Sequence, residues 1–134
     1  MAMVLVNRCA VTVIPRQPML DWLLPFAGDA DDPRLQQDSS VYLLPAYHDD
    51  QQAWQRLQEV SDRIFSAELV LWCRDQQQWP QQRDFSVFLH WFSVTFHSLV
   101  ADLSPEPLAL LALDPDLTAD LRRSLGAAAA ISPA

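Results

Sequence analysis

The sequence contains no lysine, only two glycines and only two cysteines. The absence of lysine excludes Schiff-base chemistry and the lysine of a P-loop. Gly28 and Gly126 are too few for any glycine-rich loop that cradles a nucleotide phosphate, and no GxSxG motif of a serine hydrolase occurs. These motif-based activities are therefore excluded.

The cysteines and histidines are spaced poorly for metal binding. Cys9 and Cys73 lie far apart, no CxxC or HxxxH occurs, and neither cysteine is close in sequence to a histidine. The N-terminus has no basic segment followed by a long apolar stretch and a cleavage site, and no apolar run approaches the length of a membrane span. We expect reduced thiols, a cytoplasmic location, no metal, no cofactor and no membrane partner.

Positive charge is also scarce. The sequence has 9 basic residues, all of them arginine, and 17 acidic residues, which gives a formal net charge of -8. Phosphate contacts need a basic footprint, and Arg122-Arg123 is the only adjacent pair, so we expect no nucleic-acid partner. Asp29, Asp31 and Asp32 lack the alternation and closing Glu of a calcium loop and indicate a solvated loop.

Aromatic residues, by contrast, are plentiful: 5 Trp, 6 Phe and 2 Tyr among 134 residues. They bury the most area per residue, and the length suits one ordinary domain. Composition shifts after Pro107, where Leu and Ala begin to dominate. We predict a single domain over residues 1–107 and a helical, terminally frayed tail over 108–134, in which Leu117, Leu121 and Leu125 recur at i, i+4 spacing.

The pattern of apolar residues predicts a series of elements. Residues 4–14 are expected to form a strand whose second half is buried on both faces, and a short helix follows from Pro18 to about Pro25. A second strand covers 40–44. A long helix over 49–73 starts at Asp49, which forms a capping box with Gln52.

Residues 84–103 fit two descriptions. Their apolar residues would share one face of a continuous helix capped by Asp84, but Val94 and Thr95 are β-branched and favour a strand. We favour a helix to about residue 92 followed by a strand. The order strand, helix, strand, helix, helix, strand then predicts a two-layer α/β sandwich with a small, about three-stranded sheet packed on helices through crossover connections.

Several short motifs prompt a comparison with known sequences. They are Asn7-Arg8-Cys9-Ala10, Pro15-Arg16-Gln17-Pro18, Leu20-Asp21-Trp22, Tyr42-Leu43-Leu44-Pro45, Glu68-Leu69 with Trp72-Cys73, Trp79-Pro80 with Arg83-Asp84, Trp91-Phe92, and His97 to Leu103. Over about residues 7–107 this set resembles a group of short bacterial proteins to which no activity is assigned. The resemblance implies one domain, a bacterial origin and a cytoplasmic location, but no functional residue.

Two residues are candidates for acid–base chemistry. Glu68 lies on the apolar face of the predicted long helix, where an ionised carboxylate is unfavourable unless it is paired, so it suggests a general acid or base with a raised pKa. The structural alternative is an ion pair with an arginine such as Arg8 or an edge position. His97 would be its partner, and the alternative is a histidine bonded to backbone or to Ser98.

Trp79 is the aromatic residue most expected at the surface, because it stands beside Pro80 in a Gln-rich loop. With Arg83 it would form a binding patch. Cys73 is expected to serve packing. We favour a protein-interaction or regulatory module, with a homodimer as one form of it; the alternatives are a small Glu68–His97 enzyme and an acidic inhibitor that mimics a polyanion.

Overall fold

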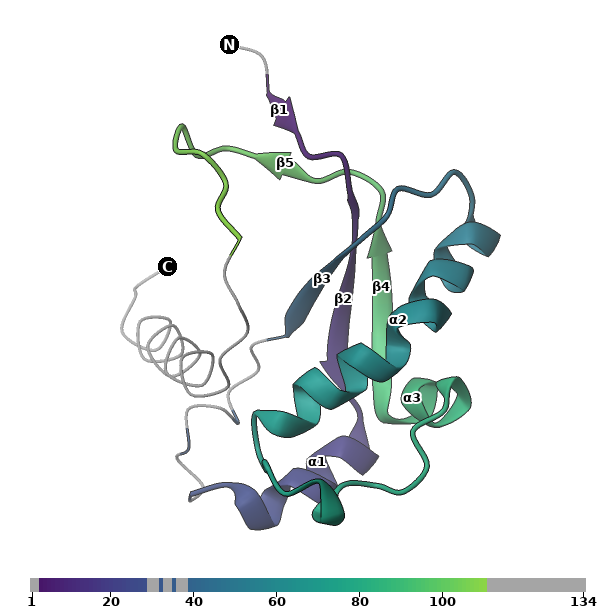
Figure 1. The fold of residues 1–134 in the computed structure, drawn as a ribbon, viewed down its shortest axis with the longest axis vertical. Coiled ribbons are helices and arrows are strands. Elements are labelled where there is room, and N and C mark those ends of the chain that lie inside the picture. Colours follow the sequence, from purple (N-terminus) through teal and green to yellow (C-terminus); the bar gives the residue numbers. More distant parts are fainter. Residues whose placement is uncertain (1–2, 29–31, 33–34, 36–38, 111–134) are drawn as a thin grey trace.

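The fold is an α/β sandwich built on a three-stranded antiparallel sheet. The computed structural model describes residues 3–28, 32, 35 and 39–110 (Figure 1). The sheet has the order β3-β2-β4. Its strands are β2 (Cys9–Pro15), β3 (Ser40–Leu44) and β4 (Phe92–His97). A separate ribbon pairs β1 (Val4–Leu5) with β5 (Ala101–Asp102), also antiparallel.

The connections explain how a sheet with only antiparallel pairs still contains a crossover. Both edge strands run antiparallel to β2, so they are parallel to each other. The chain passes from β3 to β4 through α2 (Asp50–Val70), the 3-10 turn η3 (Gln76–Gln78) and α3 (Phe85–Trp91). Parallel strands need such a helical connection, which here spans the central strand.

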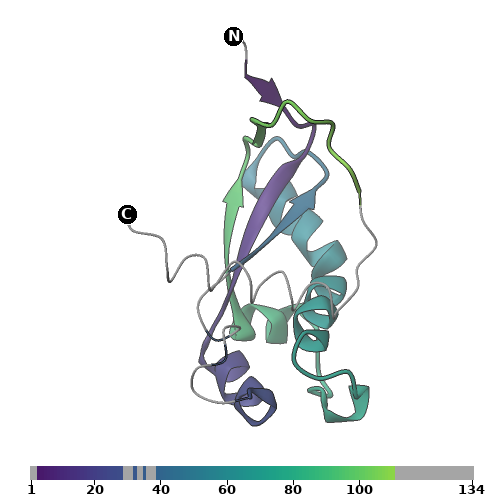
Figure 2. The same cartoon turned by 90° about the vertical axis from the view of Figure 1, so that its left-hand side faces the viewer.

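Side-chain caps and a proline mark where the helices begin. In α2 the Asp49 side chain accepts a hydrogen bond from the backbone N–H of Gln52, and in α3 Asp84 accepts from Val87. Helix α1 (Gln17–Leu23) has a proline in its first turn and continues into the 3-10 turn η1 (Leu24–Phe26). Figures 1 and 2 show α1 and α3 together at one end of the strands, while α2 lies across one face of the sheet.

An aromatic cluster fills the space between that face and the helices. Phe65 of α2 lies with its ring centroid 5.4 Å from that of Phe92, which in turn is 5.3 Å from Phe88. All three side chains are fully buried, as are Val11 and Val13 of β2. Contacts of this kind contribute more than area alone when rings meet edge to face. The core therefore lies on the helix side of the sheet.

The predicted two-layer α/β class is confirmed, and so are the strand over 40–44 and the change from helix to strand near residue 92. The single strand over 4–14 is wrong in its first half. Asn7 and Arg8 are exposed, and the strand segment before them pairs in the ribbon instead of the sheet. Burial on both faces is only partly right, because Ile14 is exposed. Of the tail predicted over 108–134, residues 108–110 are described and are not helical, and the rest lies outside the described residues.

Candidate functional site

Glu68 lies near the end of α2 and is 4 % exposed. Its Oε2 accepts a hydrogen bond of 3.1 Å from the hydroxyl of Ser40, the first residue of β3. The prediction that this carboxylate sits on the buried face of the helix is confirmed. Arg8, the partner expected in the structural alternative, is exposed and donates from Nη1 to the carbonyl oxygen of Asn7 (2.9 Å).

His97 lies on the other face of the sheet. It ends β4, pairs in register with Ala10, and its Nε2 is 2.8 Å from Oγ1 of Thr12. Ser40, which binds Glu68, is in register with Val13 on the helix-covered face. Ala10 and Val13 are separated by about 10 Å along the strand at roughly 3.3 Å per residue. Glu68 and His97 therefore do not share a cleft, and this contradicts the acid–base pair as a direct catalytic unit.

Trp79 is buried, so the prediction that it lies at the surface is wrong. Its side chain is 7 % exposed, and its indole N–H donates to the carbonyl oxygen of Cys73 at 2.7 Å. Arg83 is half-buried; its Cζ lies 5.6 Å from the Trp79 ring centroid, and Nη1 donates to Pro80 O (2.8 Å). Sequence reasoning failed here because Trp79 bonds back to Cys73, six positions earlier, and joins the buried core cluster, and the loop's composition does not show this.

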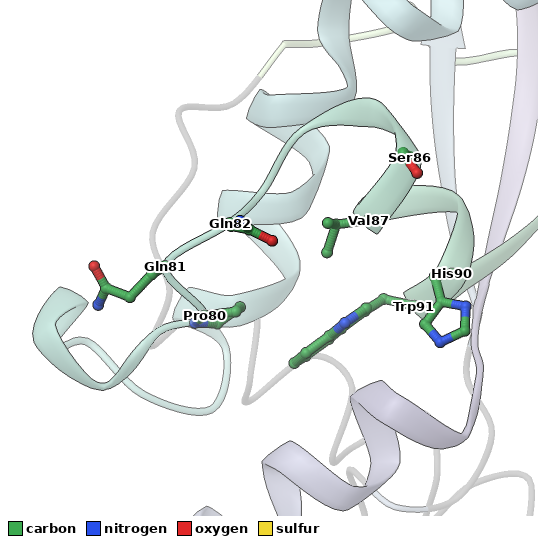
Figure 3. Close-up of a pocket in the computed structure, with 7 residues that line it drawn as sticks. All are labelled: Pro80, Gln81, Gln82, Ser86, Val87, His90 and Trp91. Atoms are coloured by element: carbon green, nitrogen blue, oxygen red, sulfur yellow. The ribbon is translucent and has the colours of Figure 1, made fainter.

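The loop that follows Trp79 does border a groove, but with a different tryptophan. Figure 3 shows this groove between the loop and α3, with the indole of Trp91 between Pro80 and His90. It is open to solvent, has a volume of about 590 Å³, and is lined by Pro80, Gln81, Gln82, Ser86, Val87, His90 and Trp91. No acid or arginine is among these residues. The groove can offer an apolar wall and amide, hydroxyl and imidazole hydrogen bonds, without a charged anchor.

The face of the sheet opposite the helices is unusual for its chemistry. We call it the outer face; its register positions are Ala10, Thr12, Ile14, Val41, Leu43, Ser93, Thr95 and His97. None of these eight side chains is an Asp, Glu or Arg. An antiparallel sheet with one solvated face normally alternates apolar residues inside with polar residues outside. Here Val41 is 61 % exposed and Leu43 48 %, so β3 turns apolar side chains to both faces.

A metal or nucleophilic centre finds no support in the described part of the chain. No group of three or more His, Cys, Asp or Glu residues within residues 3–28, 32, 35 and 39–110 is placed to hold a metal ion. Cys9 and Cys73 are free thiols and both are buried. The Cys73 Sγ lies 3.6 Å from the carbonyl oxygen of Asp75, in keeping with packing at the end of α2.

No family model matches the chain, and no curated protein or solved structure is significantly similar to it. The resemblance to a bacterial group therefore stays a prediction. Among the described helices, each is too short or too polar to traverse a bilayer. The function must accordingly be argued from the surface of the fold.

The sequence did contain a signal for the outer face. In the strand Val41-Tyr42-Leu43-Leu44 every residue is apolar or aromatic, although an edge strand of a two-layer fold has one solvated face. Sequence reasoning identified the strand but not its place at the edge of the sheet. As long as the strand's position at the edge of the sheet is unknown, Val41 and Leu43 cannot be distinguished from core residues.

Proposed function

We propose that this chain is a protein-interaction module whose partner binds across the outer face of the sheet. One observation carries the proposal: the outer face has no acidic or arginine side chain and exposes Ile14, Val41 and Leu43. Exposed apolar surface of this kind on a folded domain marks a site of association. A cytoplasmic location is part of the proposal and is supported by the free, buried thiols.

The dimensions of the face indicate what kind of partner fits. At about 3.3 Å per residue β2 is roughly 23 Å long, and three strands spaced about 4.8 Å apart add a width of about 10 Å. One amphipathic helix covers such a strip. Because the chain carries a net charge of -8, a partner helix with basic residues beside its apolar stripe associates faster than an acidic one.

A homodimer remains a second form of the same proposal. A two-fold axis through the outer face would bring Val41 and Leu43 of one copy onto the same residues of the other, as isologous interfaces do. The repulsion between two chains of charge -8 opposes it. Light scattering at increasing protein concentration distinguishes a dimer from a monomer that waits for a different partner.

Affinity capture of the tagged full chain from its own host, read by proteomics, tests the proposal. The double variant Val41→Asp/Leu43→Asp should lose the captured partner, because two carboxylates would be desolvated in the interface. The matched control is Gln55→Asp/Gln58→Asp on the exposed side of α2. Circular dichroism shows that both variants are folded. Retention of the same partner by the outer-face variant overturns the proposal.

A further inference from the structure

We infer that β4 is a second binding site, at which an extended peptide adds to the sheet as a fourth strand. The site goes beyond the proposed function, because it uses the edge of the sheet and not its outer face; Val41 and Leu43 lie on β3, at the opposite edge. Figure 2 shows β4 at one side of the sheet, with no described strand beyond it. Three observations identify the ligand: the direction of the β4 backbone groups, the composition of the strand and the aromatic residues beside it.

The backbone groups of β4 point alternately toward β2 and away from it. The N–H of Arg16 donates to the carbonyl oxygen of Trp91 at 2.7 Å, and this pair lies in the register of the β2–β4 ladder. Bonded and non-bonded pairs alternate in an antiparallel ladder, so Val94 and Phe96 direct their N–H and C=O groups away from β2. Among the described residues, no strand pairs with them on that side. These groups recur at about 6.6 Å, twice the rise of about 3.3 Å per residue. An extended chain presents complementary groups at the same spacing.

The composition of β4 lacks the features that protect natural edge strands. Such strands avoid pairing with other chains by carrying charged side chains, a proline or a β-bulge. The segment Phe92–His97 contains no Asp, Glu, Arg, Lys or Pro. Its register with β2 runs without a bulge from Phe92 to His97. The edge is therefore open to an added strand, which gains its affinity from main-chain hydrogen bonds.

Aromatic side chains beside β4 give the site an apolar side. Trp54 of α2 is 42 % exposed, and its ring centroid lies 5.0 Å from that of Phe96 and 6.4 Å from that of Phe85. Side chains on the same face of paired strands contact each other, so residues of the added strand on the helix side reach Phe96 and Trp54. Tryptophan is enriched among the residues that dominate binding energy. The ligand therefore carries apolar side chains at every second position.

The remaining side chains of the ligand meet a polar border. Ser93, Thr95 and His97 of β4 lie on the outer face and carry hydroxyl and imidazole groups. Successive side chains of a strand point to opposite faces, so the ligand alternates apolar residues with residues that form hydrogen bonds. The net charge of -8 makes a neutral or basic peptide a better ligand than an acidic one.

A library of random ten-residue peptides displayed on phage supplies the probe. With the full chain as bait, we expect the enriched peptides to have an apolar residue at every second position. One enriched peptide is then synthesised with a single N-methyl group at each position in turn. Methylation of an amide that faces β4 should weaken binding by about tenfold, because the donor is lost and its acceptor on β4 stays unpaired. Methylation of the next amide, which faces solvent, should change Kd by less than about threefold.

Amide hydrogen exchange followed by NMR locates the site on the protein. In the free chain the amides of Val94 and Phe96 should exchange at least about tenfold faster than those of Ser93 and Thr95, and the bound peptide should slow both. Val94→Pro removes one outward donor at a position where an edge strand accepts proline, and it should weaken binding by about tenfold. The matched control Val94→Ala also loses the valine side chain but keeps the donor, and it should weaken binding by less than about threefold. Circular dichroism shows whether both variants are folded.

Each outcome decides for or against the peptide site. The inference is overturned if no peptide is enriched or if no N-methyl group lowers the affinity. Slow exchange of Val94 and Phe96 in the free chain also overturns it, and slow exchange that fades on dilution assigns the edge to a second copy. Peptide effects confined to the amides of Val41 and Leu43 place the peptide on the outer face, which overturns the inference and supports the proposed function. If Val94→Pro does not fold, the N-methyl series and the exchange rates still decide, because both use the unaltered protein.

Discussion

At the scale of single residues, Tyr47 holds its hydroxyl away from water without a hydrogen-bond partner among the described residues. Its ring packs edge to face on Phe96, with centroids 6.0 Å apart. Burial raises the pKa of the phenol above its ordinary 10.0, and the charges of Cys9 and Asp50 act in the same direction. The ring thus contributes packing, while the hydroxyl contributes an unpaired donor.

Replacing Tyr47 with phenylalanine should therefore leave the protein at least as stable at pH 7, with a gain of up to about 1 kcal/mol, because an unsatisfied buried group is removed. The folded state holds the phenol proton more tightly than the unfolded chain. Ionisation of the phenol is therefore harder in the folded state, so the stability that depends on the protonated phenol is complete below pH 10 and is lost as the pH rises through the raised pKa. Urea unfolding at pH 7, 9 and 10.5 should show this alkaline loss in the parent and less of it in Tyr47→Phe. A variant that is clearly less stable at pH 7 would show that the hydroxyl is satisfied in solution.

Trp79, which the sequence analysis places at the surface, is expected to contribute strongly to stability. Trp79→Ala should lower the free energy of unfolding by about 3–5 kcal/mol, as removal of a buried aromatic ring does. Trp79→Phe should lose less, because it keeps most of the ring and gives up mainly the 2.7 Å hydrogen bond to Cys73. Guanidinium unfolding followed by circular dichroism measures both. If Trp79→Ala unfolds at the parent's midpoint, the residue does not belong to the core.

At the scale of elements, the long helix α2 depends on its first turn. The Asp49 carboxylate accepts the backbone N–H of Gln52 at 2.8 Å, and the Gln52 side chain accepts the N–H of His48 at 2.8 Å. Asp49→Ala should cost about 0.5–2 kcal/mol, because one free N–H of the helix end loses its acceptor. The control Asp50→Asn removes a neighbouring charge but no cap and should cost about 0.3–1 kcal/mol. If Asp49→Ala and Asp50→Asn lose equal stability in thermal unfolding, the hydrogen bond of Asp49 to the helix end contributes nothing beyond its charge.

The elements also show how far sequence reasoning reaches. Asp49 and Asp84 mark two helix starts by local chemistry that needs no tertiary information, and both were predicted. The change from helix to strand at Phe92 was predicted because Val94 and Thr95 follow it. The ribbon of β1 and β5 was missed, because two-residue strands carry no periodic signal and depend on a partner about a hundred positions away.

The candidate site was predicted less well than the fold. Burial of Glu68 followed from helical spacing, which is a local property. Its separation from His97 depends on which face of the sheet each residue joins, and a one-residue change of register reverses a face. Trp79 is buried through its bond back to Cys73, and Trp91 borders the groove at the end of α3; neither follows from composition. Which residues share a surface built from several strands therefore follows from the structure and not from the sequence.

At the scale of the whole molecule, the charge distribution sets the response to salt. The chain carries a net charge of -8. The ion pair between Arg56 and Glu59 is 3.8 Å long and largely exposed, so it contributes less than about 1 kcal/mol. With 17 acidic residues and 9 basic ones, repulsion among the carboxylates should outweigh attraction at low ionic strength. Added salt screens charges over a Debye length of about 10 Å at 0.1 M, which falls to about 3 Å at 1 M.

We therefore expect the free energy of unfolding to rise by about 1 kcal/mol when NaCl increases from about 10 mM to about 500 mM at pH 7. Urea unfolding at fixed temperature measures it, and KCl should act equally, because screening depends on ionic strength and not on the identity of the cation. The variant Asp62→Asn, which removes one exposed charge from α2, should start more stable and gain less from salt. A stability that falls with NaCl would mean that attractive pairs outweigh repulsion. In that case the argument that charge disfavours self-association through the outer face would fail with it.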